Sequence, residues 1–293
     1  SGSSNDTLTN SSIFTDMTFV MRTDSSTEYY GIGSRKSGQY HLQTNNTNSY
    51  SSGWMDSTKP WANMTGVMMN GANGAGNTGS LVDFSFKRAP GFFDVVTYNG
   101  TGSLTNIPHN LRAVPQMMWI KNGVAGYNWV TYNSVSGASK IMYLDGASTD
   151  VTSSVFNSTA PTSTHFTVNA SSPEVNNVGH KFLALLFGNV PGICKIGGYT
   201  GTGGNINIDC GFTSSARFVM IKRRDAGAGG AWHVFNTALG IQNTSEYHMY
   251  LNSSTLAILE DNIDPYSSGF TVASTATVNV NASGGEYLYM AIA

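Results

Sequence analysis

The feature that most constrains this chain is an internal repeat at a spacing of 101 residues. The segment 89–121 aligns with 190–222 without a gap, and Tyr98, for example, coincides with Tyr199. Self-similarity at a fixed spacing indicates that one structural unit is used more than once. The chain is therefore expected to fold as copies of a unit of about 100 residues.

A third and fainter copy occupies the N-terminal part. Its "FVMR" at 19–22 aligns with "MWIK" at 118–121, and Phe86 lies 101 residues before Phe187. We therefore predict three tandem domains, which are a divergent first repeat at 1–88 and further repeats at 89–189 and 190–293.

The first repeat lacks its first strand, because nothing before Leu8 resembles the "FDVVTY" or "CKIGGY" that opens the other two. Two explanations stay open. The chain is cut from a longer polypeptide, or a neighbouring subunit supplies the strand by adding it to the edge of the sheet.

The hydrophobic pattern predicts an all-β fold. Apolar and polar residues alternate in segments such as "FDVVTY", "FVMIK" and "EYLYM", and no stretch sustains a helical period. The segments are short, rich in β-branched and aromatic residues, and separated by Gly, Asn, Ser and Pro. This pattern is typical of an antiparallel β-sandwich, so we expect tandem, jelly-roll-like β-sandwich repeats.

Composition narrows the class of partner. Only 11% of the residues are charged, against about 25% in an average globular protein. The net charge is −2, and no basic stripe that would suit nucleic acid stands out. The longest apolar run, 182–187, is far shorter than a membrane-spanning helix. We expect no nucleic-acid partner, no membrane insertion, and an extracellular or virion-surface location.

The repeat carries a glycine-rich phrase twice, as "YNGTGS" at 98–103 and "YTGTGG" at 199–204. A phosphate-binding loop would need a helix behind it and a lysine, whereas both phrases run into a strand. We therefore predict that they are β-turns of hairpins.

A hairpin centred on Thr202 would place Cys194 and Cys210 opposite each other on adjacent strands. Directly opposed side chains lie about 5 Å apart at Cβ, which is close enough for sulfur contact. Two buried free thiols are the preferred interpretation of this cross-strand cysteine pair, and a disulfide is the alternative.

Catalytic, cofactor-binding and metal-binding motifs are not recognised in the sequence. The one acidic cluster, "LEDNID" at 259–264, reads as a solvated turn, and the six histidines have no metal-ligand spacing. His109, in "IPHNL", is expected to fix a turn by hydrogen bonding. The chain is therefore predicted to be non-enzymatic and to need no cofactor.

Aromatic residues leave one candidate binding surface. Trp129 and Trp232 occupy equivalent positions and are expected in the core. Trp54, Trp61 and Tyr266 flank the prolines of a shared turn, where an aromatic ring could stack on a sugar. Core packing or a subunit interface is the preferred interpretation of these three residues, and sugar stacking is the alternative.

Several segments resemble a known family, namely 86–122, 157–168, 199–212 and 281–293. They are similar to an uncharacterised repeat domain of large structural proteins in marine tailed bacteriophages, which are often described as tail fibre or tail proteins. The resemblance implies a phage virion structural protein and carries no enzymatic motif.

The expected function is accordingly a tail fibre or surface appendage that contacts host surface glycans. The expected partners are further copies of the chain, as a homo-oligomer with a trimer favoured, or other virion proteins, together with host surface polysaccharide. One alternative is a capsid decoration protein or a self-assembling extracellular filament subunit. A second alternative is a glycan depolymerase, which would need converging carboxylates.

Overall fold

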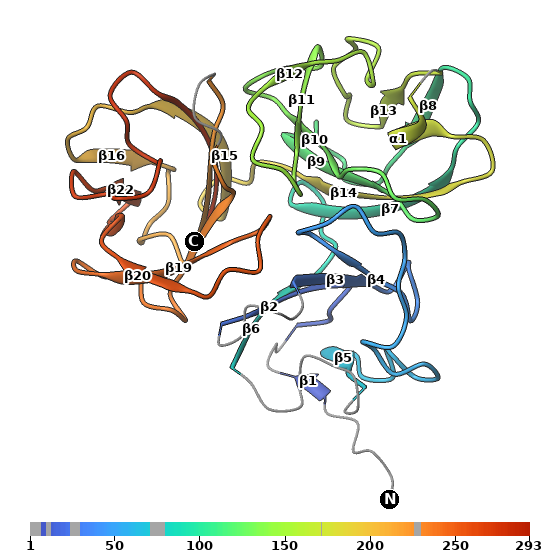
Figure 1. Cartoon of the computed structure of the whole chain (residues 1–293), viewed down its shortest axis with the longest axis horizontal. Coiled ribbons are helices and arrows are strands. Elements are labelled where there is room, and N and C mark those ends of the chain that lie inside the picture. The colour runs from blue at the N-terminus through green and yellow to red at the C-terminus, as the bar shows by residue number, and fades with distance from the viewer. Residues whose placement is uncertain (1–6, 10–12, 24–29, 71–79, 171, 226–229) are drawn as a thin grey trace, which may run out of the picture.

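The computed structural model describes residues 7–9, 13–23, 30–70, 80–170, 172–225 and 230–293. Regular structure in these residues is almost entirely β, and every pairing between named strands is antiparallel. The predicted all-β, antiparallel sandwich fold is confirmed. Figure 1 shows three lobes around a common centre, which are the N-terminal lobe (7–86), the middle lobe (93–187) and the C-terminal lobe (194–292).

The middle lobe has a large and a small sheet. The large sheet has the order β12-β11-β10-β9-β14-β7, and the small sheet pairs β13 with β8. The elements are β7 (Phe93–Asn99), β8 (Thr105–Pro108), β9 (Met117–Asn122), β10 (Val130–Asn133), β11 (Lys140–Tyr143), β12 (Val151–Thr152), β13 (His165–Val168), α1 (Pro173–Asn176) and β14 (Lys181–Phe187).

The C-terminal lobe follows the same plan. Its large sheet has the order β15-β23-β17-β18-β19-β20, and its small sheet has the order β16-β22-β21. The strands are β15 (Cys194–Thr200), β16 (Ile206–Asp209), β17 (Phe218–Arg223), β18 (His233–Asn236), β19 (Glu246–Tyr250), β20 (Ile258–Glu260), β21 (Ile263–Tyr266), β22 (Gly269–Val272) and β23 (Glu286–Ile292).

The N-terminal lobe is smaller. A four-stranded sheet, β4-β3-β2-β6, lies beside the pair β1-β5. The strands are β1 (Thr7–Thr9), β2 (Met17–Arg22), β3 (Tyr30–Ser34), β4 (His41–Gln43), β5 (Gly66–Met68) and β6 (Leu81–Phe86). Within the described residues β6 ends its sheet, whereas β14 and β23 each carry a further strand. The domain boundaries at 88/89 and 189/190 stay predictions from the sequence.

Strand pairing corrects the alignment of the first repeat. Met17 lies opposite the last residue of β6, as Met117 lies opposite the last residue of β14. Met21 therefore corresponds to Lys121, and the predicted match of "FVMR" with "MWIK" is wrong by one residue. A one-residue shift in a strand exchanges its two faces, and a faint four-residue similarity cannot detect that shift when both faces are apolar.

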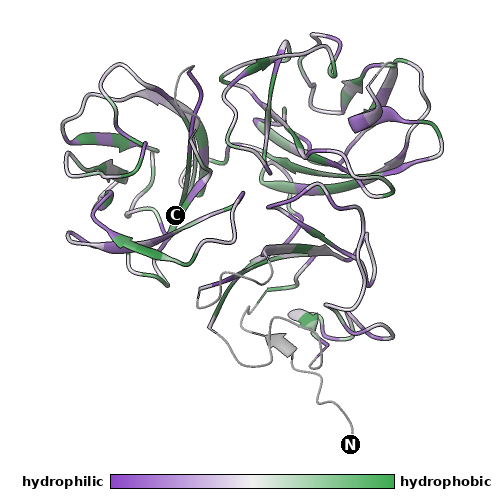
Figure 2. Ribbon diagram, in the orientation of Figure 1, coloured by the Kyte–Doolittle hydropathy of each residue, from purple (hydrophilic) through white to green (hydrophobic). Residues whose placement is uncertain are grey.

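The large sheets are buried on both faces. In β9, Trp119 faces the centre of the molecule, whereas Met118 and Ile120 face the core of the middle lobe itself. The same alternation in β14 explains why "FLALLF" is a continuous apolar run, which Figure 2 shows as hydrophobic colour along the large sheet of the middle lobe. Only a strand covered on both sides has such a sequence.

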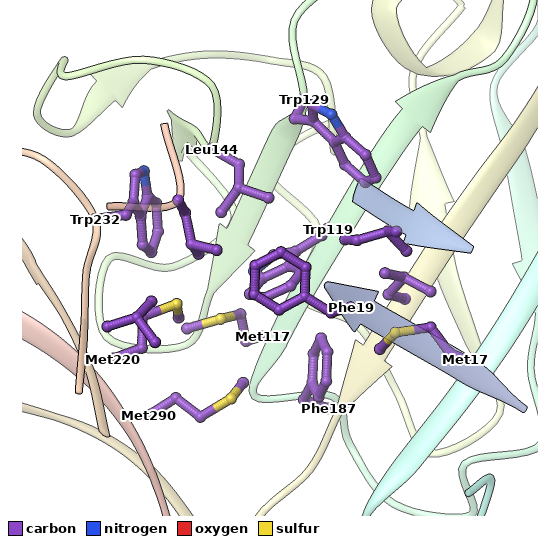
Figure 3. Close-up of a cluster of buried hydrophobic side chains, with 14 of the residues drawn as sticks. Met17, Phe19, Met117, Trp119, Trp129, Leu144, Phe187, Met220, Trp232 and Met290 are labelled. Atoms are coloured by element: carbon purple, nitrogen blue, oxygen red, sulfur yellow. The ribbon is translucent and has the colours of Figure 1, made fainter. Parts of the chain in front are cut away.

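The inner faces of the three large sheets form one central core (Figure 3). It is rich in methionine and aromatic residues and includes Met17, Phe19, Met117, Trp119, Trp129, Leu144, Phe187, Met220, Trp232 and Met290. Trp129 and Trp232 are fully buried there, which confirms their predicted core position. Complete burial of one such side chain stabilises the fold by about 1.5–3 kcal/mol.

Three hydrogen bonds link the lobes in a ring around this core. The indole of Trp129 donates to the carbonyl of Gln43 (2.8 Å), and the indole of Trp232 donates to the carbonyl of Tyr143 (2.9 Å). Tyr30, at the corresponding place in the N-terminal lobe, donates to the carbonyl of Thr255 (2.9 Å). Among these three bonds, each lobe donates one to another lobe, so that together they close a ring.

The glycine-rich phrases do not turn hairpins. β15 and β16 belong to different sheets, so "YTGTGG" carries the chain from the large sheet to the small one. The predicted hairpin centred on Thr202 is therefore wrong, and Cys194 and Cys210 are not cross-strand partners: Cys194 lies opposite Ile292, and Cys210 follows β16. A crossover and a hairpin have the same local sequence, because both need a sharp turn between two strands.

Candidate functional site

The three aromatic candidates for glycan or interface contact lie at separate places in the structure. Trp54 is 1% exposed and packs with Met55, Val67 and Met69 inside the N-terminal lobe. Its ring is closed to a ligand, so the core alternative describes it correctly.

Trp61 and Tyr266 lie in different lobes. Trp61 is half-buried, donates its indole N–H to the carbonyl of Gly38 (2.8 Å), and has the Arg35 guanidinium 5.1 Å from its ring centroid. Tyr266, also half-buried, lies in β21 opposite Gly269. The three predicted residues therefore form no common site.

Both cysteines are buried free thiols. Burial raises the pKa of Cys194 to about 12 and that of Cys210 to about 11. The thiols therefore stay protonated and unreactive at neutral pH, since the thiolate is the reactive form. The free-thiol interpretation agrees with the structure, although the hairpin on which it was based is absent.

A buried asparagine holds each glycine-rich crossover. Asn281 accepts from the amide of Thr202 (3.1 Å) and donates to the carbonyl of Gly204 (2.8 Å). Asn176 makes the matching contacts in the middle lobe. A Cβ at Gly201 would lie 2.3 Å from the carbonyl oxygen of Ala282, so the crossover requires glycine there. The chain itself uses these polar groups, which agrees with a structural role for the phrase.

A different pair of aromatic residues lines a hollow between the N-terminal and middle lobes. Tyr40 is 43% exposed, and its ring centroid lies 5.9 Å from that of Tyr50, with the rings tilted by 45°. We call this site the tyrosine hollow. It has a volume of about 360 Å³ and is lined by Lys36, Ser37, Tyr40, Tyr50, Thr97, Tyr98, Asn99, Lys181 and Phe182.

A tight turn between β3 and β4 positions Tyr40. Its amide donates to the carbonyl of Ser37 (3.2 Å), and the hydroxyl of Ser37 donates to the carbonyl of Tyr40 (2.9 Å). Gly38 takes the positive φ of 65° that this turn requires. The backbone under Tyr40 is thus fixed before any ligand arrives.

Contact with the middle lobe positions Tyr50. Its amide donates to the carbonyl of Gly123 (3.0 Å), and its ring lies so close that a Cβ at Gly123 would be 2.1 Å from a ring carbon. Burial raises the pKa of Tyr50, so the phenol stays neutral. The tyrosine hollow therefore depends on the seam between two lobes.

The charge of the tyrosine hollow is positive. Lys36 and Lys181 line it, and its lining residues include no aspartate or glutamate. An exposed aromatic ring stacks on the C–H face of a sugar, and hydroxyl and amide groups bond to sugar hydroxyls. Together with the two ammonium groups, this arrangement can bind an acidic glycan.

Sequence reasoning missed this site because its parts lie far apart in the chain. Residues 36–50, 97–99 and 181–182 meet only after two lobes pack together. One local feature of the sequence was available to indicate the site: two tyrosines flank the amide-rich segment "HLQTNNTNS", which contains no tryptophan.

Two buried lysines are structural. Lys222 donates to the carbonyls of Gly230 and Gly146, and Lys121 donates to the carbonyl of Tyr127. Burial lowers the pKa of Lys222 to about 7 and that of Lys121 to about 8. Both amines lack access to solvent, so a ligand cannot reach them.

His109 has the predicted role. Its Nε2 lies 3.1 Å from the carbonyl of Thr162, and its Nδ1 accepts from the amide of Leu111 (3.3 Å). These contacts connect the turn after β8 to the segment just before β13, as expected for a structural histidine.

In the part of the chain that the structure describes, no group of three or more His, Cys, Asp or Glu side chains is placed to hold a metal ion. A search of the same residues finds no helix with the length and apolar character to cross a membrane.

The family described as a domain of unknown function, DUF7483, matches residues 3–293. The chain belongs to the DUF7483 family. No curated protein and no solved structure matches it. The DUF7483 match covers all three lobes together.

Proposed function

We propose that the chain is a non-enzymatic structural protein of a phage virion, in a tail fibre or surface appendage, and that its tyrosine hollow contacts acidic glycans on the host surface. The tyrosine hollow is the observation that carries the glycan part of this proposal. The virion part is supported by the resemblance of the repeat segments to phage structural proteins and by the low share of charged residues.

The mechanism is passive recognition. Tyr40 presents a ring held by its turn, so little conformational entropy is lost on binding. Lys36 and Lys181 attract a carboxylate or sulfate group of the sugar. One such site is weak, and a homo-oligomeric appendage would present several copies, so avidity would provide firm attachment.

Binding to a panel of acidic and neutral polysaccharides tests the glycan part. Tyr40→Ala should weaken binding of an acidic glycan by about twofold to tenfold, because an aromatic contact is worth about 0.5–1.5 kcal/mol. Tyr247→Ala is the matched control, since Tyr247 is also 43% exposed but lies on β19 of the C-terminal lobe. Equal loss in both variants, or binding of neutral glycans alone, would contradict the assignment.

Two further measurements separate the alternatives. Release of reducing ends from a bound polysaccharide would contradict a function of binding alone and would favour a glycan depolymerase. Antibody labelling of purified phage particles should mark the tail or a surface appendage, and labelling across the head would favour a capsid decoration protein.

A self-assembling filament subunit is the second candidate, because the open edge of β6 offers backbone groups to another chain. Long unbranched filaments of the purified protein in electron micrographs would favour it.

A further inference from the structure

In the part of the chain that the structure describes, the three seams between lobes are built alike, except that one lacks a strand. At two seams, the turn after β3 or after β10 lies against the first strand of the next lobe, which is β7 or β15. Lys36 and Ser37 line the tyrosine hollow with 97–99 of β7. Val135 lies so close to β15 that a Cβ at Gly198 would be 2.9 Å from it.

At the third seam, the corresponding turn meets a groove. Thr237 donates its amide to the carbonyl of Arg217, as Ser134 does to Gln116 and Arg35 does to Asp16, so Ala238 corresponds to Val135 and Lys36. Ala238 lines the groove.

The groove lies between the C-terminal lobe and the outer side of β6. It has a volume of about 480 Å³. We call it the β6 groove, and its lining includes Asp83, Phe84, Ser85, Phe86, Phe92, Arg217, Phe218, Asn236, Thr237, Ala238, Ile292 and Ala293.

Strand pairing shows what the β6 groove is shaped to hold. In the middle lobe, Phe93 begins β7 opposite Phe187 and also packs against Phe86 of the preceding lobe, with ring centroids 5.3 Å apart. The same position at the third seam would lie opposite Phe86 and beside Ile292, and both of these residues line the β6 groove.

Backbone groups on the outer edge of β6 point toward this space. The bond from the amide of Thr23 to the carbonyl of Ser80 (3.0 Å) sets the phase of the β2–β6 pairing. Since the bonding direction alternates along a strand, Leu81, Asp83 and Ser85 direct their N–H and C=O groups away from β2. The described residues provide no strand on that side.

We propose that the β6 groove accepts an extended strand of seven residues from a different protein, which adds to β6 in the antiparallel direction as β7 adds to β14. The strand would complete the N-terminal large sheet and cover Phe84 and Phe86, which are half-buried where their counterparts Leu185 and Phe187 are fully buried.

The chemistry of the strand follows from β7 and β15, "FDVVTYN" and "CKIGGYT". Residues one and three are apolar because they face the central core, and residue six is aromatic. Residue four would face Asp83, whose carboxylate accepts from Thr18 and Ser85 and whose pKa is raised by burial. A hydroxyl or amine at residue four would therefore suit this acceptor better than the valine of β7.

A synthetic peptide of residues 87–99, labelled with a fluorophore, is the probe. It should bind the full chain with saturable anisotropy, and hydrogen exchange should slow at the amides of Asp83 and Ser85. A peptide with Val96→Thr should bind more tightly than the parent, because the hydroxyl reaches the Asp83 carboxylate.

Backbone N-methylation of the peptide tests the register without altering the protein. The bond from the amide of Gly100 to the carbonyl of His180 (2.9 Å) implies that the amide of Val96 points at the acceptor strand and that of Val95 points away. N-methylation at Val96 should weaken binding by about tenfold or more, while N-methylation at Val95 should change it by about twofold or less.

A protein variant gives a second readout. Ala238→Arg places a long side chain in the β6 groove from an exposed turn and should abolish peptide binding while leaving the fold intact. Lack of saturable binding, or equal effects of the two N-methyl peptides, would overturn the proposal. Concentration-dependent dimers that protect the β6 amides without peptide would also overturn it, because a second copy would then be the occupant.

Discussion

Two seams share one backbone framework but differ in their contacts. One lies between the middle and C-terminal lobes, and the other lies between the C-terminal and N-terminal lobes. At the first seam, Arg224 binds Asp150 (3.2 Å) across the boundary and Glu286 (2.7 Å) within its own lobe, and β15 fills the edge of the sheet. At the second, Tyr30 and Thr44 donate hydrogen bonds across the boundary, but the edge of β6 faces the groove.

The remaining seam, between the N-terminal and middle lobes, is intermediate. Tyr50 and Gly123 occupy the places that Asp150 and Arg224 hold at the ion-paired seam, as shown by the matching bonds from Tyr50 to Gly123 and from Asp150 to Arg224 (both 3.0 Å). One backbone framework thus carries an ion-pair network, an aromatic hollow or an open groove, depending on a few side chains and on whether a strand fills the edge of the sheet. Such a scaffold separates stability, which comes from the central core, from the binding that we propose for the seams.

The largest expected difference is between two equivalent phenylalanines. Phe187→Ala should lower the free energy of unfolding by about 3–5 kcal/mol, since Phe187 is 1% exposed and its removal leaves a cavity. Phe86→Ala should cost about 1–2 kcal/mol, because the half-buried ring already has partial access to water. Urea unfolding of both variants measures the difference, and equal costs would show that the β6 groove is closed in solution.

Removal of the ion pair at the closed seam should have an intermediate effect. Arg224→Met leaves the buried Asp150 carboxylate with the Lys140 ammonium, 4.0 Å away, as its remaining cation, which should cost about 2 kcal/mol near neutral pH. Burial raises the pKa of Asp150 and Arg224 opposes that rise, so the variant's folded state holds the Asp150 proton more tightly than the unfolded state does. Its extra instability should therefore shrink as the pH falls toward about 4, because Asp150 takes up a proton in the folded state and then carries no charge for Arg224 to balance.

Unfolding curves of wild type and Arg224→Met across this pH range provide the measurement. Arg217→Met, in the lining of the β6 groove, is the control variant. A cost for Arg224→Met that is independent of pH would refute the electrostatic explanation.

The smallest expected effect concerns Lys222. The N-terminal lobe already has Met21 at the corresponding strand position, so Lys222→Met should fold. The pKa of Lys222 is lowered to about 7 in the folded state and is about 10.4 when unfolded. The unfolded state therefore binds more protons between these values, and wild-type stability should rise with pH by about 1.4 kcal/mol per unit at most.

Lys222→Met should flatten that rise and should be at least as stable as wild type near pH 7. Calorimetry between about pH 6 and 9 tests this, with Lys121→Met, whose parent lysine has a pKa of about 8, as the comparison. An unchanged slope in Lys222→Met would place the titrating group elsewhere.

The sequence predicted the all-β fold and the core positions of Trp129 and Trp232 because both depend on local pattern. It could not predict that "YTGTGG" crosses between sheets, since a sharp glycine turn serves a hairpin equally well. The deciding residue, Asn281, lies 77 positions from Gly204, and a single sequence does not show that they bond.

The central core and the tyrosine hollow escaped prediction for a related reason. A strand buried on both faces, such as β14, reads as an apolar run and does not say what lies on its second face. The sequence made Trp54 a candidate for sugar stacking because tryptophan has the largest aromatic side chain. The exposed ring is Tyr40, whose exposure is set by the packing of another lobe.

The central core also determines how the molecule can come apart. Its side chains come from all three lobes, seven of them methionines, so no lobe can leave without exposing the inner sheets of the other two. The three lobes should therefore unfold in one cooperative transition, although the repeats in the sequence predict three tandem domains. Oxidation of a single central methionine to its sulfoxide would lower the stability of the whole protein, because a polar group would then lie where the three lobes meet.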